Sequence, residues 1–193
     1  MRGLLLAAAV LFSSAFGAQA QCYLGLGIGA GISSTKASVT GLPITLDGLG
    51  ANGVVGSARA GCDVSVGPSF WVGVFGSAHR ANQEFKVSPL MTATFTDGYQ
   101  IGGRIGTNIG TARPYLLAAY TWQKMSLDIP IPGISAPSFR GLSLGGGVEF
   151  DLSKNWVAGI EGQSTRFNSE SVAGVVNLEP QDINVKATLA YRF

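Results

Sequence analysis

Charge, cysteine and histidine are all scarce in this sequence. Charged residues make up 12% of the 193 residues, and 13 basic against 11 acidic residues leave a net charge of +2. That balance gives no electrostatic basis for binding nucleic acid. Two cysteines are too few for a small domain held together by disulfides. Because His79 is the single histidine and no spacing is typical of metal ligands, we expect no metal, no cofactor and no catalytic residues.

Apolar residues and glycine are abundant instead. The chain is 46% hydrophobic, contains 28 glycines and has a mean hydropathy of +0.30. It is too apolar for a disordered chain, and too rich in glycine and polar residues for a bundle of membrane helices.

Residues 1–20 predict a secretory signal peptide. Arg2 precedes an apolar run, and the small residues Ala18 and Ala20 are typical of a cleavage site. A helical anchor needs about 18 apolar residues, and polar residues interrupt this run sooner. We therefore expect export through the general secretory route, followed by one domain over 21–193.

Alternation with a period of two dominates the rest of the chain. From Cys22 to Ser33 one face is apolar and the other is almost all glycine, which predicts a strand because each glycine would cost a helix about 1 kcal/mol. A tilted transmembrane strand needs about 9 to 11 residues. Alternating stretches of this kind lie at 22–33, 53–64, 70–80, 99–109, 114–124, 140–151, 156–167 and 182–193.

The connections between these stretches alternate in length. The long ones are 34–52, 81–98, 125–139 and 168–181, and the short ones are 65–69, 110–113 and 152–155. Barrels of the outer membrane have short periplasmic turns and longer outer loops. The pattern predicts an all-β fold, an eight-stranded antiparallel up-and-down transmembrane β-barrel with both chain ends on the periplasmic side.

Charged residues fall on the face predicted to point into the barrel. An eight-stranded barrel has room only for side chains, so we expect these groups to form a polar network that fills the lumen. Glycines on the same face, such as Gly61, Gly73 and Gly106, leave space for it. The predicted network consists of Arg59, Asp63, Arg104, Glu149, Glu161, Lys186 and Arg192.

The aromatic residues near strand ends allow two interpretations. The alternation points Trp71 and Phe75 inward, whereas aromatic residues at strand ends also form the interfacial girdles of membrane barrels. The candidates for a girdle are Trp71, Tyr99, Tyr115, Trp122 and Trp156.

The run RGLSLGGGVEFDLSKNWVAGIEGQSTRF resembles the signature hairpin of small outer-membrane β-barrels of the alphaproteobacterial surface-antigen and opacity type, related to the OmpA-like membrane domain. The residues that carry the resemblance are Gly147, Val148, Glu149, Phe150, Asn155, Trp156 and Glu161. The ending LAYRF is similar to the C-terminal signal read by the barrel-assembly machinery. The resemblance therefore implies an assembly signal at Leu189, Tyr191 and Phe193, and a setting among outer-membrane lipid and lipopolysaccharide.

Cys22 and Cys62 fall near the periplasmic rim of the first predicted hairpin, on the same face. A disulfide between them and a pair of small lipid-facing thiols both remain open.

For function, we expect a structural role in envelope integrity together with surface-exposed interactions. The apolar, proline-bearing stretches within 34–52 and 125–139 have two interpretations. They either extend the barrel as hairpins above the membrane, or they contact a host partner, a neighbouring barrel or a hydrophobic or haem-like ligand. A narrow passive porin-like channel is an alternative. A lipid A-modifying enzyme is a distant one, because His79 is followed by Arg80 and Ala81 rather than by a serine two residues on.

Overall fold

The computed structural model describes residues 20–39, 45–88, 91–128, 138–172 and 176–193. No helix in these ranges is long and apolar enough to cross a membrane. The expected signal peptide lies outside the described residues except for Ala20, so its cleavage stays a prediction.

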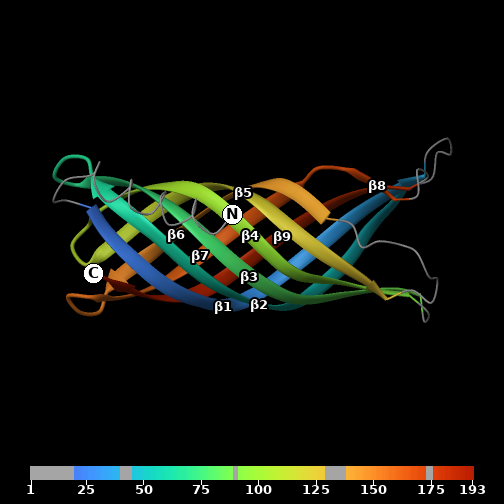
Figure 1. Ribbon diagram of the computed structural model, residues 1–193, viewed down its shortest axis with the longest axis horizontal. Helices are drawn as coiled ribbons and strands as arrows, with labels where there is room; N and C mark the ends of the chain where they lie inside the picture. Colours follow the sequence, from blue (N-terminus) through green and yellow to red (C-terminus); the bar gives the residue numbers. More distant parts are fainter. Residues whose placement is uncertain (1–19, 40–44, 89–90, 129–137, 173–175) are drawn as a thin grey trace, which may run out of the picture.

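Antiparallel strands make up nearly all of the described chain and close into a barrel (Figure 1). The strands are β1 Ala20–Val39, β2 Thr45–Ser65, β3 Phe70–Ser88, β4 Met91–Thr107, β5 Ala112–Asp128, β6 Ser138–Asp151, β7 Trp156–Phe167, β8 Glu170–Val172 and β9 Val176–Arg192. Each strand pairs with its neighbour in sequence up to β7, and β1 pairs with β9 to close the sheet. Closure leaves no strand edge facing hydrocarbon, as a membrane-spanning sheet requires.

The barrel wall has eight strand positions, although the described residues form nine strands. β9 pairs with β1 along one edge and with β7 along the other, from Gln181 to Tyr191. The three-residue β8 pairs with β9 further along, where Leu178 and Asn177 are already paired with β1 on their other side. β8 therefore continues the place of β7 after a short break, and the prediction of an eight-stranded barrel is confirmed.

The short turns lie where the sequence predicts them, at the end of the barrel that also holds the C-terminus (Figure 1). Gly67 and Gly110, with φ of 92° and 61°, supply the left-handed conformation in two of these turns. Because short turns mark the periplasmic side, the opposite end of the barrel is the outer end.

The strands extend into all four long connections, in agreement with the interpretation of 34–52 and 125–139 as hairpin extensions of the barrel. β1 and β2 continue to Val39 and from Thr45, and β5 continues to Asp128, so only the middle of each connection lies outside the described strands. The central residues 40–44 and 129–137 are outside the described residues. Inward-facing side chains are still buried where these extensions begin, at Thr35, Ala51 and Phe139.

Side chains alternate between the lumen and the lipid-facing surface as predicted. On β1, Leu24, Leu26 and Ile28 are 58–68% exposed, while Tyr23 is buried inside. The girdle interpretation is wrong for Trp71 and Tyr115, which are buried in the lumen. Lipid-facing aromatic residues instead gather at the two ends: Tyr99, Tyr120 and Trp122 at the outer end, and Phe70, Phe150, Trp156, Tyr191 and Phe193 at the periplasmic end.

Candidate functional site

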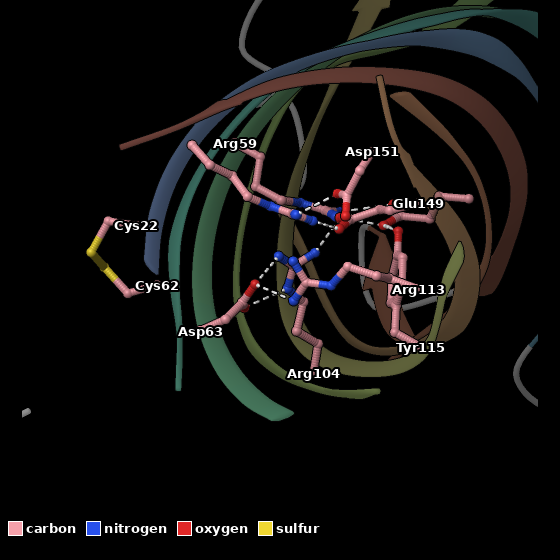
Figure 2. Close-up of polar contacts among 11 residues, drawn as sticks. Cys22, Arg59, Cys62, Asp63, Arg104, Arg113, Tyr115, Glu149 and Asp151 are labelled. Atoms are coloured by element: carbon pink, nitrogen blue, oxygen red, sulfur yellow. Dashed lines mark hydrogen bonds and ion pairs between the residues drawn. A yellow bond between two sulfur atoms is a disulfide. The ribbon is translucent and has the colours of Figure 1, made fainter. Parts of the chain in front are cut away.

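Arg104, on β4, reaches into the lumen in the half of the barrel that is nearer the short turns, and Figure 2 shows it among the carboxylates and guanidinium groups there. Its Nε and Nη2 donate to Oδ1 and Oδ2 of Asp63 at 2.9 and 2.7 Å, and its Nη1 donates to Oε1 of Glu149 at 2.6 Å. β2, which carries Asp63, and β6, which carries Glu149, are separated by three strands in either direction around the barrel. One guanidinium thus joins opposite walls of the lumen.

The network continues toward the periplasmic rim through two more cations. Arg192 donates to Glu149 at 2.6 Å and to Asp151 at 2.7 Å. Arg113 lies 3.6 Å from Asp63 (Figure 2). Each carboxylate in this layer therefore faces at least one guanidinium, which is the condition for burying such charges without a large penalty.

Aromatic rings surround Arg104. Its guanidinium carbon lies 4.2 Å from the ring centroid of Tyr23, 4.9 Å from that of Trp71 and 5.4 Å from that of Tyr115. Arg113 lies over Trp71 at 4.7 Å. Cation–π contacts of this kind are strongest where water is excluded, so the rings both fill the lumen and hold the guanidinium groups.

A second buried cluster forms around Glu161 further from the periplasmic rim. Arg59 donates to Glu161, with Nη2 to Oε1 at 2.7 Å, and Tyr115 donates its hydroxyl at 2.8 Å. Lys186 Nζ lies 3.2 Å from Glu161 Oε1. The Arg59 guanidinium stacks on Phe75, 4.4 Å from the ring centroid. The fully buried Glu161 carboxylate therefore has two cations and a hydroxyl as partners.

Neutral polar groups fill the lumen above the Glu161 cluster. Gln163 donates to Gln100 at 2.7 Å, and Gln100 donates to Ser77 at 2.9 Å. A second series of hydrogen bonds links the hydroxyls of Thr121, Ser143 and Thr165. Because these groups are hydrogen-bonded to one another, this part of the lumen is filled by neutral polar side chains.

Inward-facing glycines make room for these side chains at two clear positions. A Cβ built at Gly73 would collide with the Asp63 carboxylate, and one at Gly106 would collide with the Trp71 ring. The packing of the lumen therefore requires glycine at these two positions.

All seven residues predicted to line the lumen meet in these two clusters, and no ion pair between described residues joins one cluster to the other. Four further members were not predicted: Arg113, Tyr115, Asp151 and the ring of Tyr23. Alternation could have found two of them. Arg113 is two residues before the buried Tyr115, and Tyr23 is two residues before the inward-facing Gly25, so alternation places both side chains in the lumen. Arg113 and Asp151 escaped prediction because they belong to or border predicted turns.

Cys22 and Cys62 are paired residues of β1 and β2 and are joined by a disulfide. It lies outside the ring of strands, apart from the polar side chains (Figure 2). Of the two alternatives left open by the sequence, the structure has the bridge, and it lies at the periplasmic rim.

His79, the single histidine, has an amide side chain as its neighbour in the lumen. His79 Nε2 lies 2.6 Å from Gln123 Oε1, and Gln123 supplies neither a nucleophile nor a carboxylate. No group of three or more histidine, cysteine, aspartate or glutamate residues is arranged to hold a metal within the described ranges. The arrangement suits charge neutralisation and rigid filling of the lumen.

Several solved structures of low sequence identity are similar to this barrel. Ail, the attachment invasion locus protein of Yersinia pestis, is 18% identical over 89% of this chain and 99% of its own, with a TM-score of 0.44. Neisserial surface protein A is 18% identical over 87% and 97%, with a TM-score of 0.48. OprG from Pseudomonas aeruginosa is 11% identical over 91% and 97%, with a TM-score of 0.49.

Among curated protein sequences, none matches this chain. The family model of the outer membrane protein beta-barrel domain, in contrast, matches residues 4–193. It covers every strand of the closed barrel. The chain belongs to the outer membrane protein β-barrel domain family and is an integral protein of the outer membrane.

Proposed function

We propose that this protein is a closed structural barrel, which supports envelope integrity and presents its outer end for interactions. The observation that carries the proposal is the bridge made by Arg104 between Asp63 and Glu149 on opposite walls of the lumen. A buried ion pair across the pore blocks passage, and breaking it leaves an uncompensated charge, so the plug is stable in place.

Two small cavities in the lumen support the same role. A cavity of about 30 Å³ lies near His79 and Lys186, and another of about 20 Å³ lies near Tyr23 and Arg59. Each has room for about one or two water molecules. Spaces of this size favour a filled barrel over a porin-like channel.

Planar-bilayer recording tests the closed lumen. The refolded full chain is expected to give no discrete conductance steps, provided that insertion is verified by the different gel mobility of heated and unheated samples. Regular steps of constant size would contradict the proposal and favour the narrow passive channel.

Envelope integrity needs a test in cells. Removing the protein from its own bacterium is expected to raise sensitivity to detergents and large antibiotics, and restoring the chain should reverse the change. Unchanged sensitivity would argue against the envelope role and leave surface interaction as the function.

Loop-mediated binding of a host surface or of a hydrophobic or haem-like ligand is the second candidate. It is favoured by the low charge of the stretches at 41–50 and 126–138, which fall between β1 and β2 and between β5 and β6 in the sequence. Because β5 ends at Asp128 and β6 begins at Ser138, deletion of residues 129–137 removes the connection without shortening either strand. Binding that survives this deletion and one of residues 40–44 would reject the candidate. A lipid A-modifying activity has less support, because His79 pairs with Gln123.

A further inference from the structure

Three cations lie next to one another on the outer surface of neighbouring strands. Lys124 on β5, Arg140 on β6 and Arg166 on β7 are all exposed and share the lipid-facing parity of Trp122 and Leu142. We propose that these three residues form a binding site for the phosphate groups of a lipid in the outer leaflet. This proposal identifies a partner for the surface role proposed above. It depends on which end of the barrel faces outward, and it does not depend on whether the lumen is closed.

The strand register sets the spacing of the three cations. Arg140 pairs with Trp122, two residues before Lys124, and Leu142 pairs with Arg166. Arg140 is therefore the diagonal neighbour of Lys124 on one side and of Arg166 on the other, since the backbone N–H of Asn168 donates to the Arg140 carbonyl. Diagonal neighbours in a sheet lie about 7–8 Å apart, within reach of one ligand for side chains of this length.

The positive charge of this group is uncompensated within the described side chains. None of the three cations makes an ion pair there, whereas Arg80 at a similar level lies 3.7 Å from Asp97. The neighbouring exposed residue on β9, which pairs with Arg166, is the uncharged Gln181. Three like charges on adjacent strands oppose one another, and a bound anion relieves that repulsion.

The height of the group matches the headgroup level of the outer leaflet. Trp122 and Tyr120, whose rings meet edge to face at 4.8 Å, mark the outer interface directly below Lys124. On β7, Arg166 follows Trp156 of the periplasmic girdle by ten residues. At about 3.3 Å per residue and a tilt of about 40°, this spans about 25 Å, the height of the apolar band of such barrels.

Phosphate attached to a lipid fits this surface better than free phosphate does. The cations lie on the exposed outer face of the strands, and the exposed side chains of Leu142, Leu144 and Tyr120 on the membrane side of them provide a surface for acyl chains. Arginine pairs with phosphate through two parallel N–H donors. A phosphorylated glycolipid such as lipopolysaccharide offers both parts of the ligand.

Native mass spectrometry of the refolded full chain in neutral detergent tests the site. Lipopolysaccharide is titrated onto the wild-type barrel and onto the variant K124Q/R140Q/R166Q. Each cation near a charged membrane surface changes affinity roughly five-fold, so the triple variant is expected to weaken binding on the order of 100-fold. Enzymatically dephosphorylated lipopolysaccharide should bind the wild type as weakly as the intact lipid binds the variant.

Two controls test whether the loss of binding is specific to these three cations. Arg80→Gln removes a cation of similar level from β3 and should change the affinity less than two-fold, and the gel mobility of unheated samples shows that each variant folds. Equal binding by wild type and triple variant overturns the site, as does equal binding of the dephosphorylated lipid. If millimolar inorganic phosphate displaced the lipid, the three cations would be a site for free phosphate, and the proposal of a lipid ligand would be overturned. None of these outcomes depends on whether the lumen conducts.

Discussion

Asp63 and Arg104 lie on either side of Gly73 in the strand register and are joined inside the lumen by two parallel hydrogen bonds of 2.9 and 2.7 Å, with both side chains at most 3% exposed. Glu149, on the wall opposite Asp63, accepts a hydrogen bond from Arg104 Nη1. Substitutions in this pair therefore test directly whether the buried charges of the lumen stabilise the barrel.

Asp63→Asn is expected to destabilise the barrel by about 3 kcal/mol, because it leaves Arg104 and Arg113 facing one negative charge fewer in a buried site. Urea unfolding of the barrel refolded into lipid vesicles measures the change. The exposed pair Arg80 and Asp97 provides the control, since Asp97→Asn should shift the free energy of unfolding by less than about 1 kcal/mol. Equal effects of the two substitutions would show that burial of the lumen pair is unimportant.

The double variant D63N/R104M should cost less than the sum of its single substitutions, because removing both partners leaves no unpaired charge between them. The same unfolding measurement gives the coupling free energy. Additive effects would mean that the two hydrogen bonds contribute independently of each other.

Gly73→Ala is expected to lower the free energy of unfolding by about 1–3 kcal/mol, since its methyl group would displace the Asp63 carboxylate from Arg104. Gly103→Ala is the matched control, because a Cβ there meets only the carbonyl oxygen of Gly73 at 3.6 Å, an ordinary contact. A control variant as unstable as Gly73→Ala would trace the effect to the strand backbone rather than to the network.

Loss of the disulfide through C22S/C62S should reduce the free energy of unfolding by about 2–4 kcal/mol, as expected for a bridge across 40 residues. Non-reducing mass analysis of protein isolated from membranes is expected to find no free thiol. Two free thiols in that sample would contradict the bridge.

We propose that Phe193 acts in assembly more than in stability. Its side chain is 72% exposed and stacks only loosely on Tyr191, at 6.5 Å between ring centroids. Deleting Phe193 should sharply lower the amount of folded barrel in the outer membrane, while the refolded variant unfolds within about 1 kcal/mol of the wild type. Leu152→Ala, in a turn at the same end, controls for a general loss of apolar surface. Normal membrane levels without Phe193 would remove it from the assembly signal.

The sequence by itself determined the class of fold and the facing of most strands. A period of two and the sorting of short and long connections predicted an eight-stranded barrel, and parity placed residues such as Glu161 and Lys186 in the lumen. These features are local, because each side chain of a strand points to the face opposite that of its neighbour.

Only the tertiary structure decided which charges meet, where the aromatic side chains lie and how far the strands extend. Arg104 reaches both Asp63 and Glu149 because closure brings β2 and β6 to opposite sides of one narrow lumen. Trp71 lies inside rather than in a girdle because a glycine on the neighbouring strand leaves it space. Such contacts depend on register and curvature across the whole sheet, and alternation along a single strand carries no information about either.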